Sequence, residues 1–184
     1  MTAVHVGHRT VADVRPRARV LPEASRIWAA LSGLGYGLVT IGIGAGHLAH
    51  YLPVGIGLLL VGFTGLGWAV LALRGTIPSA RPALLALVVT APLVLLSARF
   101  TGTLPTAAEA SALTLGLLTA VLIGLHLRTD PVDQAPPAGQ QALAMFAGAM
   151  LVATITVPGL AATDAGAHAV PHGSHGLPAE QHHH

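Results

Sequence analysis

Two histidines three residues apart stand at the end of the first long apolar block of the sequence. His47 and His50 lie in the run GAGHLAHYLP, and a helix that continued through this run would carry both imidazoles on one face. Neutral imidazole is a ligand that suits Zn²⁺, Cu²⁺ and Ni²⁺. This pair is therefore the first candidate for chemistry, as half of a divalent metal site.

Further candidate ligands lie in polar segments that we expect on the same side of a membrane. Glu109 begins the fourth apolar block and offers a carboxylate, and the end of the chain holds six of the eleven histidines. Because the chain has no cysteine and only three methionines, thiolate sites are excluded and Cu(I) is disfavoured. The sequence predicts a Zn²⁺ or Cu²⁺ site, whose candidate ligands are His47, His50, His168, His172, His175 and Glu109.

These histidines also have simpler interpretations. His47 and His50, next to Tyr51, have the character of amphipathic residues at the level of the lipid headgroups. The histidine-rich end is equally typical of a solvated low-complexity segment, and its last three histidines, residues 182–184, suit either native sequence or the remains of an expression tag. A haem held by His47 and His126 is disfavoured, because these residues belong to opposite ends of their spans.

The elements that position these residues are helices in lipid. Of 184 residues, 53% are hydrophobic and 9% are charged, whereas a soluble domain carries roughly 25% charged residues. The apolar residues form blocks about as long as the ~20 residues that a helix needs to cross a bilayer. We predict an all-α bundle of five transmembrane helices, at about residues 27–51, 54–73, 82–98, 109–127 and 142–161.

The arginines predict how this bundle is oriented. The chain has nine arginines and no lysine, and with the N-terminus inside, eight of them face the cytoplasm and only Arg99 lies outside. We therefore expect a basic cytoplasmic arm (1–26), a transmembrane domain (27–161) and a histidine-rich extracytoplasmic tail (162–184) in the plasma membrane. A four-span alternative, with the block around Pro82 and Pro92 re-entrant, gives a poorer arginine distribution.

The first two spans are rich in glycine. Gly33 with Gly37, and Gly42 with Gly46, are pairs of small residues four apart, a spacing that lets helices approach closely in lipid. Because the turn between the two spans is short, we expect these glycines to pack the spans against each other within one chain. A dimer face is the alternative.

Other functional classes find little support in the sequence. No Walker A loop, HExxH, GxSxG or strand-borne GxGxxG occurs, so we expect no enzyme. The arginines flank spans, which argues against nucleic acid as a partner. No charged residue lies in the middle of a span, which argues against the hypothesis that the chain is a transporter.

The stretch GAGHLAHYLPVGIGLLLVGFTGLGWAVLALRG, residues 44–75, carries a resemblance. It resembles small, uncharacterised multi-pass membrane proteins of high-GC bacteria, which pair a histidine-bearing first helix end with a second span that ends in tryptophan, leucine and arginine. The resemblance covers roughly residues 27–128, although the chain lacks the acidic, proline-containing segment that often precedes the fourth span in that group. The resemblance implies that His47 and His50 are important for the function of this group.

Three functions follow as hypotheses. The first is a membrane protein with a divalent metal site on its outer face. The second is a structural or assembly subunit that packs its glycine-rich helices against other membrane subunits or a second copy of itself. The third is a small transporter.

Overall fold

Helices form all the regular structure in the described part of the chain. The computed structural model describes residues 21–75, 80–100, 106–128 and 137–168. The helices are α1 (Leu21–His47), α2 (Leu52–Leu73), α3 (Ala80–Phe100), α4 (Ala107–Arg128), α5 (Ala138–Ala161) and the one-turn α6 (Asp164–Ala167). Five of them, α1 to α5, are long and apolar enough to cross a membrane, as predicted.

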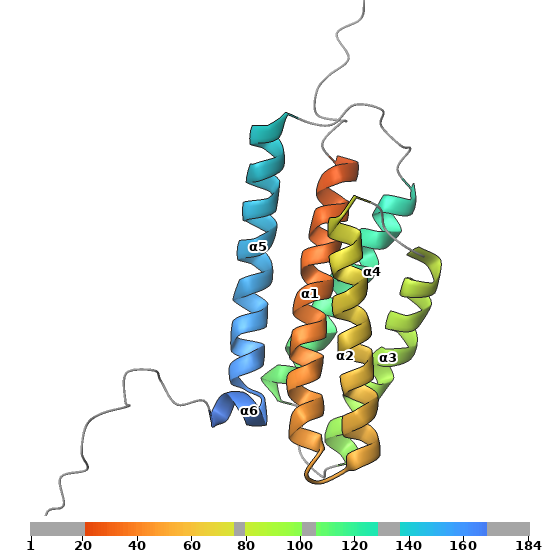
Figure 1. Cartoon of the computed structure of the whole chain (residues 1–184), viewed down its shortest axis with the longest axis vertical. Helices are drawn as coiled ribbons and strands as arrows, with labels where there is room; N and C mark the ends of the chain where they lie inside the picture. The colour runs from red at the N-terminus through yellow and green to blue at the C-terminus, as the bar shows by residue number, and fades with distance from the viewer. Residues whose placement is uncertain (1–20, 76–79, 101–105, 129–136, 169–184) are drawn as a thin grey trace, which may run out of the picture.

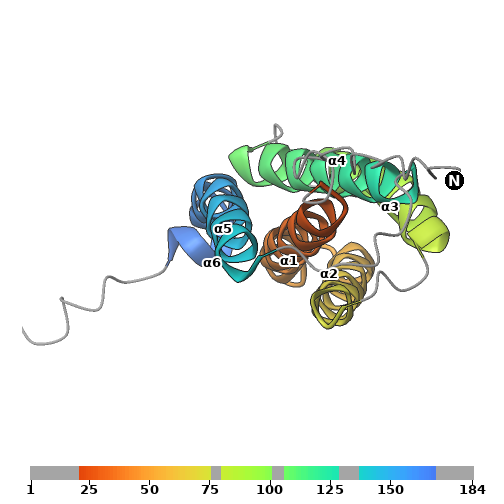
Figure 2. The same cartoon turned by 90° about the horizontal axis from the view of Figure 1, so that it is seen from above.

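Helix α1 is the centre of the bundle. It packs against α2, α4 and α5, while α3 stands on the outside against α4 (Figures 1 and 2). Two thirds of the apolar stretch of α1 is buried by its neighbours, and in each of the other four long helices the buried share is a third or less. The first of the five potential spans is therefore the core of the bundle.

The bundle has two chemically different ends. One, which we call the histidine end, holds His47, the start of α2, the end of α3, the start of α4 and α6. The other, the arginine end, holds Arg26, Arg74, Arg81 and Arg128 among the described residues. The orientation derived from the arginines, with this end in the cytoplasm, stays a prediction.

A seam of glycines joins α1 to α2. A Cβ atom added to Gly37 would lie 2.9 Å from the backbone oxygen of Gly62, and one added to Gly44 would lie 3.1 Å from that of Gly55. The two pairs are seven residues apart on each helix, so they repeat along an antiparallel crossing. The predicted packing of the first two spans is confirmed, with Gly33 beside Trp68 of α2.

The second predicted glycine pair serves a different neighbour. A Cβ atom on Gly42 would lie 2.9 Å from Thr163, and one on Gly46 would lie 3.0 Å from Asp164. Both neighbours belong to the segment that begins α6. The expectation that Gly42 and Gly46 pack against the second span is therefore wrong, because they occupy the opposite side of α1.

Helix α3 is continuous, with Pro92 inside it. The alternative in which this block is re-entrant is therefore wrong. One of its links to α1 is a hydrogen bond between the Tyr36 hydroxyl of α1 and the Thr90 hydroxyl of α3, which are 2.8 Å apart. Helices α2 and α3, although consecutive, make few contacts with each other.

At the arginine end, long side chains of α1 fasten its neighbours. The buried Arg26 donates a hydrogen bond to the carbonyl oxygen of Ala72 near the end of α2, where a cation also complements the helix dipole. The Trp28 indole donates to the carbonyl oxygen of Ala144 in α5 at 2.7 Å. Residues 21–26, expected in an irregular arm, are thus the first turns of α1.

Candidate functional site

A polar pocket of about 480 Å³ opens at the histidine end. It lies among the end of α1, the turn that follows, the start of α4 and the start of α6. Its polar lining residues are His47, His50, Tyr51, Thr106, Glu109, Thr163 and Asp164. Three of the six predicted metal ligands, His47, His50 and Glu109, therefore line one pocket.

The helix that carries His47 ends there. The His47 carbonyl oxygen accepts hydrogen bonds from the backbone amides of His50 at 3.2 Å and Tyr51 at 2.7 Å, which close a turn before α2 begins at Leu52. His50 is thus in a turn and not on the helix. The expectation that both imidazoles share a helical face is wrong, although both still line the same pocket.

The His47 ring is held by backbone oxygens on both sides. Its Nδ1 lies 2.8 Å from the carbonyl oxygen of Ile43, and its Nε2 lies 3.3 Å from that of Ser97 in α3. A ring with one proton donates to one of these oxygens, and a doubly protonated ring donates to both. Neither ring nitrogen therefore directs a lone pair into the pocket. His47 fastens α3 to α1 and is poorly placed as a metal ligand.

Glu109 caps the helix on which it stands. One of its carboxylate oxygens, Oε2, accepts hydrogen bonds from the amide of Thr106 at 2.7 Å and from the Thr106 hydroxyl. The Thr106 hydroxyl in turn accepts from the amide of Ala108 at 3.2 Å. This is a capping box, Thr-x-x-Glu, and it explains why a carboxylate that is 5% exposed is tolerated there.

Helix α6 brings a second carboxylate to the pocket. Thr163 caps α6, because its hydroxyl accepts from the amide of Gly166 at 3.1 Å, and Asp164 follows at the pocket wall. Gly166 is required for this fold of the chain, since a Cβ atom there would lie 2.0 Å from the carbonyl oxygen of Leu160. The absence of side chains at Gly42 and Gly46 lets Thr163 and Asp164 reach α1.

The remaining predicted ligands are distributed as follows. His50 is exposed and makes no side-chain hydrogen bond with the described part of the chain. His168 is 80% exposed and turns back on α6, with Nδ1 2.8 Å from the Asp164 carbonyl oxygen and 3.6 Å from its carboxylate. His172 and His175 lie outside the described residues.

The described side chains do not complete a metal site by themselves. Within residues 21–75, 80–100, 106–128 and 137–168, no group of three His, Asp or Glu side chains is close enough to hold one ion. Sequence reasoning missed Asp164 as a pocket residue and missed the structural role of Glu109. The signals were present, since Thr106 to Glu109 spells a capping box and Thr163 is a favoured helix cap.

A scan of protein-family models and searches of curated proteins and solved structures find no match to this chain. The geometry of the described residues is consequently the basis for any functional assignment. That geometry establishes a helical bundle with five potential membrane spans and a polar pocket at one end.

Proposed function

We propose that this chain is a multi-pass membrane protein that binds a divalent transition metal ion, Zn²⁺ or Cu²⁺, in the pocket at its histidine end. The observation that carries the proposal is that His50, Glu109 and Asp164, from a turn, α4 and α6, line one pocket. Mixed imidazole and carboxylate ligands without sulfur suit Zn²⁺ and Cu²⁺.

The free groups of the pocket are those that a metal ion requires. Among the described residues, the His50 imidazole has no hydrogen-bond partner, and only one of the two oxygens of Glu109 is engaged in its capping box. Asp164 is two thirds exposed at the pocket wall. No three His, Asp or Glu side chains of the described residues are grouped closely enough to hold one ion, so we propose that His50 binds the ion with part of this set and a further ligand.

The histidine-rich end of the chain supplies that ligand. It continues directly from α6, and His172 is four residues beyond His168, within roughly 14 Å of it even for a fully extended chain. A tether this short gives the imidazoles of His172 and His175 a high effective concentration at the pocket. We propose that one or both complete the coordination of the ion.

Metal binding to the purified chain tests the proposal. Protein prepared without a metal-affinity step and dialysed against Zn²⁺ or Cu²⁺ should retain about one ion per chain. His50→Ala and a chain that ends at His168 should each lose it, because each removes a ligand that stabilises nothing else in the described fold. His47→Ala is a poor probe, since it also releases α3.

The matched control is His126→Ala, which removes a histidine near the arginine end of α4. It should leave the bound metal unchanged. Retention of the ion by the His50→Ala chain, or the absence of stoichiometric metal in the unaltered chain, would rule the proposal out.

No observation favours the assembly subunit to the same degree. The glycines that suggested it meet atoms of their own chain: Gly37, Gly44, Gly55 and Gly62 form the seam, and Gly42 and Gly46 seat α6. The apolar residues that remain exposed on α2, α3 and α5 are what a lipid-facing surface requires.

A further inference from the structure

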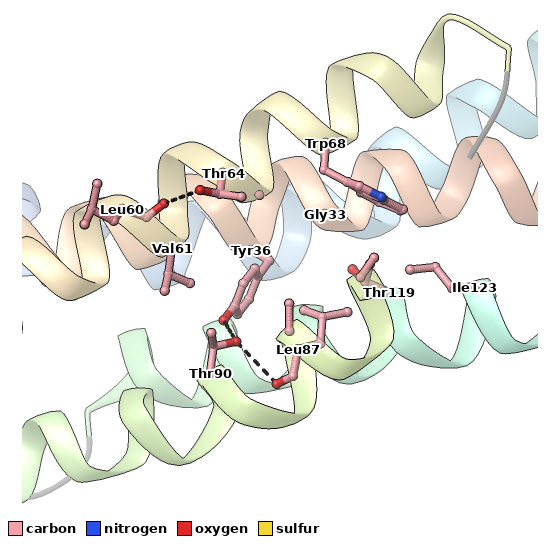
Figure 3. A pocket seen from close by; sticks show the side chains of 13 residues that line it. Gly33, Tyr36, Leu60, Val61, Thr64, Trp68, Leu87, Thr90, Thr119 and Ile123 are labelled. Carbon is pink, nitrogen blue, oxygen red and sulfur yellow. Dashed lines mark hydrogen bonds between the residues drawn. The ribbon is translucent and has the colours of Figure 1, made fainter. Parts of the chain in front are cut away.

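An apolar cleft of about 270 Å³ lies between α2 and α3 (Figure 3). Gly33 and Tyr36 of α1 form its back wall, and Thr119 and Ile123 of α4 lie beside them. Its two sides come from α2 and α3, at residues Leu60, Val61, Thr64, Gly65, Trp68, Ala83, Ala86, Leu87 and Thr90.

The hydroxyl groups of the cleft already have partners inside the protein. Tyr36 and Thr90 bond to each other, and Thr90 is also 3.3 Å from the Leu87 carbonyl oxygen. The Thr64 hydroxyl donates to Leu60 and that of Thr119 donates to Leu115, both at 2.7 Å. No charged side chain lines the cleft. The lining therefore suits a hydrocarbon chain, which needs no polar partner along this part of its length.

The cleft has the length and position of one lipid tail. Leu60 and Trp68 are eight residues apart on α2, a rise of roughly 12 Å, and one leaflet of the hydrocarbon core is roughly 15 Å thick. The α3 lining residues lie in the half of that helix nearer the arginine end, and so do those of α2 except Leu60 and Val61, which lie just beyond its middle. The hydrogen bond between Tyr36 and Thr90 crosses from α1 to α3 near the middle of the bundle.

Two exposed arginines lie at the arginine end of the helices that form the two sides of the cleft. Arg81 precedes the lining residue Ala83 by two positions on α3, and Arg74 follows Trp68 by six positions at the end of α2. Neither side chain has a hydrogen bond or ion pair within the described residues. Arginines at this level attract the phosphate of an anionic lipid.

We infer that the cleft binds an anionic phospholipid, with one acyl chain between α2 and α3 and its phosphate at Arg74 and Arg81. The apolar lining, a length close to that of one leaflet and the two exposed arginines at the nearer ends of α2 and α3 favour this occupant over a soluble anion or a neutral lipid. Helices α2 and α3 make few contacts with each other. The lipid chain therefore fills the space between them and packs against both helices.

Lipid retention by the full chain tests this inference. Purified protein in detergent is supplied with equal amounts of phosphatidylglycerol and phosphatidylcholine, and the lipid that remains bound is measured by native mass spectrometry. The unaltered chain should retain phosphatidylglycerol preferentially. The Arg74→Gln/Arg81→Gln chain should lose that preference by roughly tenfold or more, since each basic residue near a membrane surface contributes separately. Inorganic phosphate should not displace the lipid.

A second variant tests the acyl chain separately from the headgroup. Ala83→Leu/Ala86→Leu fills the cleft and should reduce retention of both lipids. The matched control, Val88→Leu/Val89→Leu, enlarges two side chains that are 67% and 71% exposed on another face of α3 and should retain lipid normally. Thermal unfolding of each variant establishes that it is folded.

Arg99→Gln is the control for charge, because Arg99 ends α3 at the histidine end. The inference is overturned if Arg99→Gln abolishes the preference as strongly as the Arg74→Gln/Arg81→Gln change does. It is equally overturned if filling the cleft leaves lipid retention unchanged.

Discussion

The two sides of α2 meet their neighbours in opposite ways. Toward α1, the glycines at 37, 44, 55 and 62 bring the backbones so close that an added methyl group lies within about 3 Å of a carbonyl oxygen. Toward α3, which contains no glycine, few contacts form and a cleft of about 270 Å³ remains. Apolar side chains gain little by leaving lipid for each other, so helices join where backbones approach or polar groups bond.

The largest effect of a single methyl group is expected in the seam. In Gly62→Ala, the new Cβ would lie 2.5 Å from the Ile41 side chain and 2.9 Å from the Gly37 carbonyl oxygen, and the backbone cannot yield as a side chain can. We expect a loss of about 3 kcal/mol of unfolding free energy, the upper range for overpacking. Unfolding in detergent, followed by circular dichroism, measures it.

Gly67→Ala is the matched control on the same helix. No atom lies within 4 Å of the Cβ that this change adds, so the stability should be unchanged or slightly raised by the better helix propensity of alanine. Equal destabilisation by the two substitutions would contradict a seam confined to one side of α2.

A somewhat smaller loss of unfolding free energy is expected at the arginine end of α1 and α2, beyond the glycine seam. Arg26→Met removes the hydrogen bond from a buried guanidinium to the Ala72 carbonyl oxygen and the favourable charge at the end of α2. We expect a loss of about 2 kcal/mol, as for other charge-assisted hydrogen bonds. Arg128→Met, at an exposed arginine on the same end of the bundle, should cost much less in the same unfolding assay.

The smallest effect on the unfolding free energy is expected for the hydrogen bond that joins α1 to α3 beside the cleft. The Tyr36 and Thr90 hydroxyls tie α1 to α3 by one hydrogen bond, and such bonds within membranes average about 0.6 kcal/mol. A double-mutant cycle of Tyr36→Phe and Thr90→Val should give a coupling of this size. A coupling as large as the effect of Gly62→Ala would mean that α3 is held as tightly as α2.

The sequence predicts the number and class of the helices well, because an uninterrupted apolar block of some 20 residues is a direct consequence of bilayer thickness. The third block shows this: Pro92 removes one backbone hydrogen bond, yet α3 runs from Ala80 to Phe100. The close packing of the first two spans also follows from their glycines and the short turn between them.

What the sequence leaves open is which face of a helix meets which neighbour. Glycines recur so often along α1 that several pairings satisfy the same spacing, and only the fold reveals that Gly44 serves α2 while Gly42 serves the start of α6. The position of His50 depended on where α1 ends, and that point is set by the turn at His47. The cleft is invisible in sequence, because it results from contacts that α2 and α3 do not make.

The most direct test of the contrast between seam and cleft uses the fluorescence of Trp68, which lines the cleft. The chain has two tryptophans, so Trp28→Phe leaves Trp68 as the only reporter. Phosphatidylglycerol brominated on its acyl chain should quench Trp68 strongly, and Ala83→Leu/Ala86→Leu should reduce this quenching while Val88→Leu/Val89→Leu does not. Quenching that is absent, or that is unchanged when the cleft is filled, would contradict a lipid chain between α2 and α3.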